Sequence, residues 1–533
     1  MLKKYFSEAW DLTKFTFRKE RLSSAIWLLV IISLSLFVTV AYRNLFADEG
    51  SLMEMLGVLN NPAMVTLFGP VFDTTEAGIY GATMLVFLVL IIGIMNIFLV
   101  IRNTRSEEEK GRYEVIRSLP VGRLSGLTAT LTFATIVNFI IFIVVGFGLA
   151  ICGYPFDGSI LYGLALFAGG MFFAAIAAVF AQLCSSAKSA ITYSLVTMGL
   201  LYIIRGFGDA ADGSFLSYIS PLGMLIQAQI YAANYWLLVV AVIAITAALI
   251  ALAFKLNTIR DIGRGFMAEK PGRSTGSFLM KSHSGLMFKL TRNMIIGFFI
   301  TLVVFGAMYG SIMGDMESFL SSGMFGDILA SIIPEGTNVV EGFISMLVNV
   351  LVVMAAIPAI MAILKLVGEE KNHRYEMIIS CAVSKNTLMT NHLVYALLQS
   401  VVMVFGAMIG LWIAAAAVMP NPISFVSMLS TFAVYIPAVW VFIGLAALLI
   451  GLLPKHASLI VWGYLGITFY VVYIGQLLNL PESVSYLTPL GYVPSLPLET
   501  YSIWGTLGLT TVAIVLAVIG YITYKRRDHK NML

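Results

Sequence analysis

The sequence predicts an all-α integral membrane protein. Of its 533 residues, 59% are hydrophobic and only 11% are charged, which leaves too few polar side chains to cover a soluble globule of this length. Apolar runs of about 18 residues or more, long enough to cross the hydrocarbon core as helices, recur about twelve times. An isolated strand would leave backbone groups unpaired in lipid, and the runs lack polar alternation, so we expect helices.

The predicted spans fall into two sets of six. They lie near 22–41, 82–101, 125–150, 160–181, 190–206 and 234–254, and then near 293–313, 344–366, 388–418, 424–450, 457–478 and 503–524. We expect a first half at 1–254, a flexible Gly-, Ser- and Lys/Arg-rich linker with a pre-span helix at 255–292, and a second half at 293–533. Halves that both start and end inside form tandem parallel repeats.

The charge distribution predicts the orientation. With both termini in the cytoplasm, all but two of the 32 Lys and Arg residues lie on the inner side of the membrane, and only Arg43 and Arg205 lie outside. The loops at 42–81 and 314–343 are acidic and either fold over an exit or connect spans through solvent. We expect no nucleic-acid surface.

Each half is expected to begin with an amphipathic helix on the inner membrane face. Residues 2–21 and 278–292 both interleave large apolar side chains with basic ones, which is typical of an interfacial helix. A basic flank that anchors the next span would have a similar composition. Its presence in both halves favours the helix.

A charged segment occurs once in each half, between the second and third predicted spans. The copies are EEEKGRYEVIRSLPVGR, Glu107 to Arg123, and EEKNHRYEMIISCAVSK, Glu369 to Lys385. With His373 taken as an insertion, the match pairs Glu108, Glu109, Lys110, Arg112, Tyr113 and Glu114 with Glu369, Glu370, Lys371, Arg374, Tyr375 and Glu376. A solvated loop needs charge but no repeated pattern of charge, so we interpret both copies as docking surfaces for a soluble partner.

A second repeat is expected outside, before the last span of each half. Tyr218, Pro221, Leu222 and Gly223 match Tyr486, Pro489, Leu490 and Gly491. A short apolar piece that opens with Pro and cannot span indicates a re-entrant or interfacial helix, although an ordinary interfacial anchor is the alternative. The predicted outer gate comprises Arg205, Asp209, Pro221, Leu222, Pro489 and Leu490.

The sequence offers little catalytic chemistry. No Asp, Glu, Lys or Arg lies near the centre of a predicted span, which disfavours an ion-coupled transporter, although Asn96, Asn138 and Asn349 could hold a polar ligand. There is no clustered Cys/His pattern for a metal and no GxxxxGK[ST] phosphate loop. We expect no catalytic residues, no metal, and no ATP hydrolysis by this chain.

The chain resembles the permease subunits of type-2 ABC transporters, in particular the fused twelve-span group of polyketide-antibiotic and multidrug exporters. The resemblance rests on EEEKGRYEVIRSLPVGR, on RGFGDA at Arg205 to Ala210, on YISPLGM at Tyr218 to Met224, and on the span order. It implies that two copies of a separate cytoplasmic ABC ATPase, which holds ATP and Mg²⁺, dock on Glu108, Glu109, Arg112, Glu114, Glu369, Glu370, Arg374 and Glu376. The second half departs from the pattern, because Pro120 and Gly122 become Ala382 and Ser384 and RGFGDA has no clear counterpart. The halves are therefore expected to be unequal.

We therefore expect the permease of an ATP-driven exporter that contacts membrane lipid and moves an amphipathic, lipid-like or drug substrate outwards. Spans rich in Met and Phe suit such a substrate, although lipid-facing positions favour the same residues. One alternative is a secondary transporter driven by a proton or sodium gradient. The other is a membrane-embedded enzyme or sensor that depends on outer carboxylates, namely Asp73, Glu76, Asp209 or Glu482.

Overall fold

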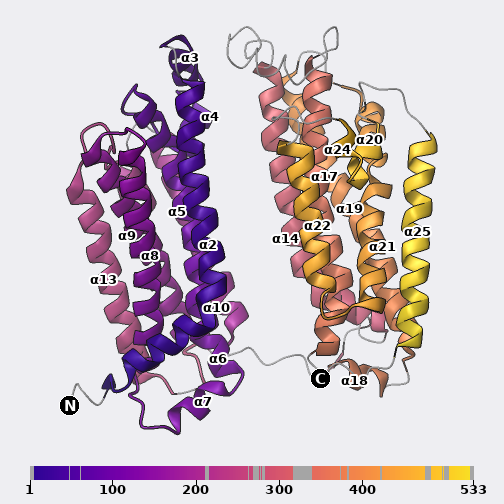
Figure 1. Ribbon diagram of the computed structural model, residues 1–533, viewed down its shortest axis with the longest axis horizontal. Helices are drawn as coiled ribbons and strands as arrows, with labels where there is room; N and C mark the ends of the chain where they lie inside the picture. Colours follow the sequence, from indigo (N-terminus) through magenta and orange to yellow (C-terminus); the bar gives the residue numbers. More distant parts are fainter. Residues whose placement is uncertain are drawn as a thin grey trace. The chain divides into compact units, whose positions relative to one another are not determined.

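The chain folds into two compact, helical units, Met1–Gly272 and Arg273–Leu533 (Figure 1). The computed structural model describes residues 5–46, 49–60, 62–210, 215–261, 263–267, 275–276, 278, 282–315, 339–371, 374–380, 383–419, 423–474, 482–494, 496 and 503–527. Within these ranges, 11 helices are long and apolar enough to cross a membrane. The only β-type pairing in the same ranges is an isolated bridge between Cys184 and Met267.

The described residues of unit 1 form six long helices and several short ones. The long helices are α2 (Ala9–Leu45), α5 (Glu76–Asn103), α8 (Ser125–Ile151), α9 (Phe156–Leu183), α10 (Ala187–Ala210) and α13 (Trp236–Ile259). The short helices are α3 (Glu49–Leu59), α4 (Pro62–Phe68), α6 (Arg105–Glu109), α7 (Arg112–Arg117), α11 (Phe215–Ile219) and α12 (Pro221–Ile226). The acidic segment at 42–81 thus contains helices of its own.

Glycines allow α9 to pack closely against α5 in unit 1. A Cβ atom on Gly169 would lie 2.6 Å from the Val89 side chain, and one on Gly170 would lie 2.6 Å from Ile92, both on α5. Such close approach strengthens van der Waals packing, which replaces the hydrophobic effect as the force between helices in lipid. By contrast, α2 and α13 expose many large apolar side chains, as expected for helices that face lipid.

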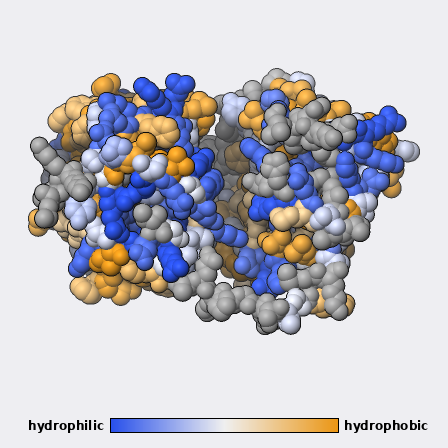
Figure 2. All heavy atoms as spheres, turned by 90° about the horizontal axis from the view of Figure 1, so that it is seen from below, coloured by the Kyte–Doolittle hydropathy of each residue, from blue (hydrophilic) through white to orange (hydrophobic). Residues whose placement is uncertain are grey.

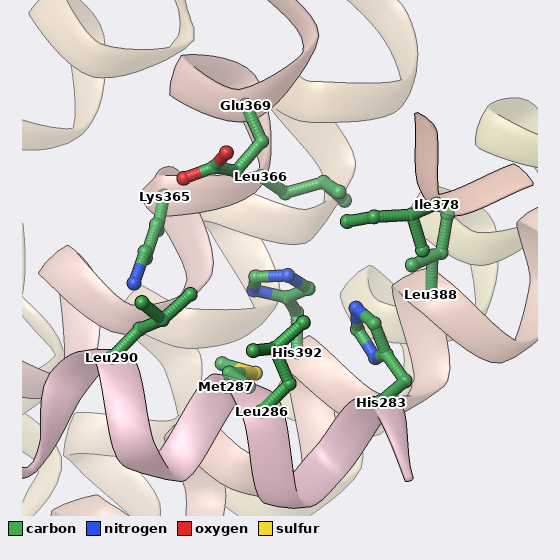
Figure 3. Close-up of a pocket in the computed structure, with 10 residues that line it drawn as sticks. All are labelled: His283, Leu286, Met287, Leu290, Lys365, Leu366, Glu369, Ile378, Leu388 and His392. Atoms are coloured by element: carbon green, nitrogen blue, oxygen red, sulfur yellow. The ribbon is translucent and has the colours of Figure 1, made fainter. Parts of the chain in front are cut away.

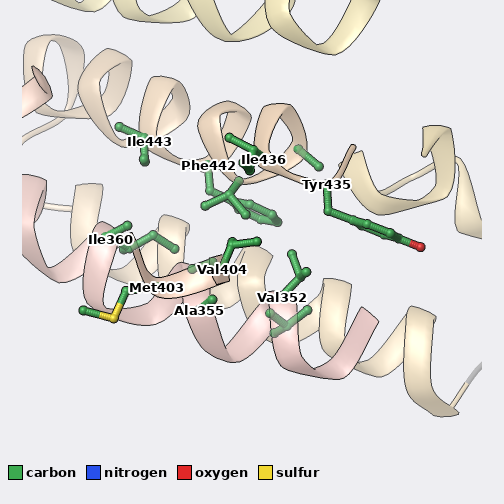
Figure 4. Close-up of a cluster of buried hydrophobic side chains, with 14 of the residues drawn as sticks. Val352, Ala355, Ile360, Met403, Val404, Tyr435, Ile436, Phe442 and Ile443 are labelled. Carbon is green, nitrogen blue, oxygen red and sulfur yellow. The ribbon is translucent and has the colours of Figure 1, made fainter. Parts of the chain in front are cut away.

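Unit 2 is built around α17 (Val339–Lys371), α19 (Lys385–Val418) and α21 (Ile436–Leu452). Figure 4 shows Val352, Ala355 and Ile360 of α17 packed with Met403 and Val404 of α19 and with Ile436, Phe442 and Ile443 of α21. The unit also contains α14 (His283–Ile312), η2 (Met313–Asp315), α18 (Arg374–Ile379), α20 (Phe425–Ala433), α22 (Ala457–Phe469), η3 (Tyr470–Ile474), α24 (Glu482–Ser485), η4 (Pro489–Tyr492) and α25 (Ile503–Arg526).

One predicted span agrees in extent but is divided, and another is shorter than expected. The span at 424–450 corresponds to the apolar helical stretch Phe425–Leu452, which is divided into α20 and α21 because Pro437 occupies the first turn of α21. The span expected at 457–478 begins as α22, which has 13 residues and continues as a π-helix. Residues 475–481 of that region lie outside the described residues, as do residues 316–338 of the second acidic loop.

The amphipathic surface helices predicted at 2–21 and 278–292 are continuous with the long helices that follow them. Residues 9–21 are the first turns of α2, and residues 283–292 are the first turns of α14. No proline or glycine interrupts the chain between these turns and the apolar run that follows, so the helix continues. The start of α2 still packs on unit 1, because the Phe17 ring lies 6.0 Å from Phe133 of α8.

Candidate functional site

A buried ion cluster lies at one end of unit 1, which we call its charged end. The Glu108 carboxylate bridges two guanidinium groups, with 2.7 Å to Nη1 of Arg105 and 2.5 Å to Nη2 of Arg260. The three side chains are only 1–7% exposed. Glu108 and Arg105 belong to α6, whereas Arg260 directly follows α13. One carboxylate therefore ties the second long helix of the unit to the last one.

Further hydrogen bonds extend this cluster to α9. Arg260 Nε donates to Oε1 of Gln182 at 3.1 Å, and Asn257 Nδ2 donates to the same atom at 2.9 Å. Arg105 donates to the carbonyl oxygens of Ser185 and Gly263. We call Arg105, Glu108, Gln182 and Arg260 the unit 1 clamp. Residues 260, 261 and 263–267, predicted as part of a flexible linker, belong to unit 1, where the carbonyl oxygens of Gly263 and Arg264 accept hydrogen bonds from this cluster.

Unit 2 has a corresponding arrangement. Glu370, near the end of α17, accepts hydrogen bonds from Arg527 Nη2 at 2.5 Å and from the Tyr524 hydroxyl at 2.8 Å. Tyr524 lies in the last turns of α25, and Arg527 follows that helix. The Glu370 and Arg527 side chains are 3% and 14% exposed. We call Glu370, Tyr524 and Arg527 the unit 2 clamp.

These contacts correct the sequence alignment of the charged segments. Glu107 pairs with Arg112 at 2.9 Å, and Glu369 pairs with Arg374 at 2.8 Å. The next residue of each segment, Glu108 or Glu370, occupies the buried clamp. The equivalent pairs are thus Glu107 with Glu369 and Glu108 with Glu370, and no insertion is needed. The predicted pairing of Glu108 with Glu369 and of Glu109 with Glu370 is wrong. It was based on residue identity alone, and identity does not show which glutamate is buried.

The other predicted docking residues are exposed on two short helices. Arg112 and Glu114 lie on α7, together with Val115, which is 69% exposed. Arg374 and Glu376 lie on α18 beside Met377, which is 64% exposed and equivalent to Val115. Glu109 is exposed too, and its carboxylate accepts the Ala187 N–H at the start of α10. Figure 2 shows hydrophilic side chains gathered on this face of each unit.

Tyr113 packs α7 against α8. The Tyr113 ring lies so close to Gly126 of α8 that a Cβ atom there would be 2.8 Å from a ring carbon. Burial raises the pKa of the Tyr113 phenol, because desolvation disfavours the phenolate more than the nearby Arg117 favours it. Arg123, which lies just before α8, donates to the carbonyl oxygens of Asn257 and Arg260 at the end of α13. Tyr113 therefore links α7 to α8, and Arg123 links the start of α8 to α13.

A second buried ion pair lies at the opposite end of unit 1. Arg205 Nη1 is 3.2 Å from Asp209 Oδ2, and both side chains are fully buried. Arg205 Nη2 also donates to the carbonyl oxygen of Leu67 in α4, and the Ser217 hydroxyl donates to Asp209 at 2.7 Å. These two members of the predicted outer gate thus hold α4 and α11 against α10.

The remaining predicted gate residues form two similar turns. Pro221 and Leu222 are buried at the start of α12, and Pro489 and Leu490 are buried in η4. The glycine that follows each Pro-Leu pair touches backbone. A Cβ atom on Gly223 would lie 2.0 Å from the Ser217 carbonyl oxygen, and one on Gly491 would lie 2.1 Å from that of Ser485. The short segments thus pack alike in the two units, with α11 or α24 beneath the glycine.

A comparison with protein families identifies the chain's relatives. The family model described as "Multidrug efflux system permease Rv1217c, C-terminal domain" matches residues 14–255 and 280–525. The chain belongs to this family. One relative, the Multidrug efflux system permease protein Rv1217c of Mycobacterium tuberculosis (strain ATCC 25618 / H37Rv), is 29% identical over 534 residues, which cover 98% of this chain and 95% of the relative.

In this Rv1217c-family chain, sequence reasoning missed the basic partners of the clamps. Arg260 and Arg527 each follow the last long helix of their unit. That shared position could have indicated a common role. In the sequence, however, both arginines look like the basic residues that ordinarily flank a membrane span. The exposed apolar residues Val115 and Met377 were missed as well, because the charged residues around them give the stronger sequence signal.

The intramembrane amides of this family member are occupied by partners within the chain. Asn96 Nδ2 donates to Asn138 Oδ1 at 3.1 Å, and Asn138 Nδ2 donates back to Asn96 Oδ1 at 2.9 Å. Asn349 Nδ2 donates to the Ser345 carbonyl oxygen at 3.1 Å. In unit 1 the two amides that could have bound a polar ligand are therefore hydrogen-bonded to each other, and this pair of bonds links α5 to α8.

We expect alanine at Gly223 or Gly491 to destabilise the protein by about 1–3 kcal/mol, because the added methyl group must displace a backbone carbonyl. The matched controls are Gly199→Ala and Gly463→Ala, since a Cβ atom at either position meets no atom within 4 Å. Both controls lie in helices, where alanine adds up to about 1 kcal/mol of stability. Thermal unfolding of the purified chain in detergent measures the difference. Equal melting temperatures for test and control variants would show that the turns are not closely packed.

Proposed function

We propose that this chain is the membrane-spanning permease of an ATP-driven exporter, which moves amphipathic, lipid-like or drug molecules out of a bacterial cell together with a separate ATPase. The observation that carries the proposal is that each unit presents a short exposed helix, α7 or α18, close to a buried clamp that reaches the unit's last helix. The name of the 29% identical relative, a multidrug efflux system permease, supports the choice of substrate class.

In this proposal, α7 and α18 are the docking sites for one ATPase each. An exposed apolar residue among charged ones, Val115 or Met377, offers the apolar centre and polar rim of a protein interface. The ATPase would hold ATP and Mg²⁺, since this chain has no GxxxxGK[ST] phosphate loop. Glu108, Glu109 and Glu370 act differently: the first and last are buried anchors, and Glu109 caps the start of α10.

The contacts of α7 provide a route for a mechanical change. ATP binding would draw the two ATPases together and move the docked helices. Movement of α7 would reach α5 directly through α6, α8 through Tyr113, and α13 through the bridge from Glu108 to Arg260. In unit 2, movement of α17 would reach α25 through Glu370 and Arg527. Each clamp thereby makes the unit respond as a whole.

Tandem repetition and cytoplasmic termini belong to the same proposal. Repetition is supported by the equivalent clamps, by the glycine turns at Gly223 and Gly491, and by the two matched segments at 14–255 and 280–525. The orientation is supported by the concentration of Lys and Arg on one side of the predicted spans.

The enzyme alternative is weakened by what the outer carboxylates do. Glu76 accepts a hydrogen bond from Tyr154 at 2.8 Å, Asp73 accepts one from Thr75, and Asp209 is bound by Arg205 and Ser217. Each carboxylate thus has a separate structural contact. The side chain of Glu482 lies outside the described residues.

Inside-out vesicles from cells that express the chain and its native ATPase test the proposal. We expect ATP with Mg²⁺ to drive uptake of a fluorescent amphipathic drug, and we expect uptake to persist when an uncoupler removes the proton gradient. A non-hydrolysable ATP analogue should stop it. If uptake instead collapses with the uncoupler while ATP is present, the chain is a gradient-driven transporter.

A further inference from the structure

A groove lies between the first turns of α2 and the side of α8, at the charged end of unit 1 (Figure 1). Its cavity volume is about 210 Å³, which is more than the roughly 150 Å³ of a cavity that binds benzene. Thr13 and Phe133 line its inner part and are buried. The Phe17 ring packs edge-on against Phe133, and Ile136 extends the apolar wall along α8. The groove therefore has mainly apolar walls and room for part of an organic molecule.

Two cations and a tryptophan line the outer part of this groove. Trp10, Lys14 and Arg18 follow one another at a spacing of four residues, so they lie on the same side of α2, and all three are exposed. Lys14 Nζ lies 5.9 Å from the centre of the Trp10 ring and 3.0 Å from Asp11 Oδ1.

The charges of this outer part favour an anion. The Lys14 and Asp11 side chains are 55% and 63% exposed, and an exposed ion pair contributes about 1 kcal/mol or less, so an incoming anion can replace Asp11 at little cost. Within the described part of the chain, Arg18 has no ion-pair partner. Lys14, Arg18 and Asp11 together sum to one positive charge. The groove thus offers a free guanidinium group and a loosely held amino group above an apolar cavity.

The two cations lie at the depth expected for phospholipid phosphates. Helix α2 has 37 residues, or roughly 55 Å of helix, whereas the hydrocarbon core is about 30 Å thick. The apolar run of α2 begins near residue 22, so Arg18 lies about one turn outside it. On α8 the exposed residues Phe139, Ile140 and Ile143 follow Ile136 at helical spacing, farther from the charged end. An apolar track therefore leads from the groove into the membrane.

The equivalent end of unit 2 is filled by protein side chains. The pocket in Figure 3 has a cavity volume of only about 40 Å³, and the His392 ring lies between Lys365 and His283. There α14 and α19 are joined by a hydrogen bond between Thr291 and the Tyr395 hydroxyl, whereas α2 and α8 meet through two aromatic rings. The site described here therefore belongs to unit 1.

We infer that the groove binds one anionic phospholipid of the membrane leaflet at the charged end. The lipid phosphate accepts charge-assisted hydrogen bonds from the Arg18 guanidinium and the Lys14 amino group. One acyl chain runs past Phe17 and Ile136 along α8. A choline headgroup fits less well, because its cation faces two others and Lys14 already lies over the Trp10 ring. This lipid site goes beyond the proposed export function and does not depend on it.

Native mass spectrometry of the purified full-length chain in a neutral detergent tests the inference, because it counts bound lipids. The probes are dioleoylphosphatidylglycerol, which is anionic, and dioleoylphosphatidylcholine, which is zwitterionic. We expect the first phosphatidylglycerol to bind at least about tenfold more tightly than phosphatidylcholine. Arg18→Met should remove this preference. Arg21→Met, which removes an exposed cation from the same helix outside the groove, should keep it.

The inference is overturned if Arg18→Met binds phosphatidylglycerol as tightly as Arg21→Met does, or if the parent chain binds phosphatidylcholine equally well. Ile136→Trp should also weaken phosphatidylglycerol binding, because the indole fills the groove; if that variant fails to fold, the comparison of the two arginine variants decides alone.

Inorganic phosphate distinguishes a lipid from a soluble anion. We expect phosphate to leave the melting temperature of the parent chain unchanged and phosphatidylglycerol to raise it in a saturable way. An increase with phosphate that Arg18→Met loses would assign the groove to a soluble anion and overturn the lipid site. None of these measurements uses ATP or an ATPase, so failure here leaves the proposed export function standing, and failure of ATP-driven uptake leaves this site standing.

Discussion

Replacing Glu108 by alanine is expected to lower the free energy of unfolding by about 3–5 kcal/mol, the usual cost of removing one partner from a buried ion pair. Without the carboxylate, Arg105 and Arg260 remain buried with like charges close together. Glu370→Ala should have an effect of the same sign in unit 2, because Arg527 and the Tyr524 hydroxyl lose their acceptor. Denaturant-induced unfolding in mixed micelles measures both changes.

Glu114→Ala on α7 and Glu376→Ala on α18 are the matched controls. Both glutamates belong to the same charged segments but are exposed, and exposed ion pairs contribute about 1 kcal/mol or less. If Glu108→Ala is no more destabilising than Glu114→Ala, the clamp does not hold the helices together, and the proposed route from α7 to α13 has no basis.

The double variant Val115→Asp with Met377→Asp is expected to abolish ATP-driven drug uptake without changing the melting temperature. Both side chains are largely exposed, so a carboxylate there is solvated in the free chain. In a docked complex each would place an unpaired charge in the apolar centre of an interface, where hot-spot losses are about 2 kcal/mol or more, or roughly thirtyfold in affinity. Uptake of a fluorescent drug into inside-out vesicles measures the loss.

Phe266→Asp with Leu453→Asp forms the matched control pair. These residues are 47% and 50% exposed and lie outside α7 and α18. The control pair should retain uptake, because it adds the same two charges outside the proposed docking helices. Equal activity of the two double variants would show that α7 and α18 are not where coupling occurs.

Much of the fold could be predicted from the sequence because membrane helices leave a strong signal. Long apolar runs indicated α5, α8, α9, α10 and α13 directly, since each is a continuous helix over most of its predicted span. Helix ends were harder. The apolar run at 457–478 gave no hint that α22 would change to a π-helix at Tyr470, because that change depends on packing and not on composition.

The sequence pointed to the two charged segments, but it did not show which contacts their residues make. Charge and repetition drew attention to the two glutamate-rich segments, yet a sequence does not show which glutamate of EEE points inwards. That depends on Arg260, which lies far along the chain and reaches Glu108 only when α13 packs beside α9. The same limit applies to Arg205, which donates to the carbonyl oxygen of Leu67 in α4. For the segment 42–81 the sequence left open whether it folds over an exit or connects spans through solvent.

In the proposed complex, a separate ATPase docks on α7 and α18. The most direct test of this docking is co-purification from native membranes with a tagged copy of the chain, set beside the Val115→Asp, Met377→Asp variant. We predict that a soluble ATPase purifies with the parent chain, that it is lost from the variant, and that the Phe266→Asp, Leu453→Asp control keeps it. If no ATPase purifies with the parent chain under gentle conditions, α7 and α18 are not docking sites for an ATPase, and gradient-driven transport becomes the function to test.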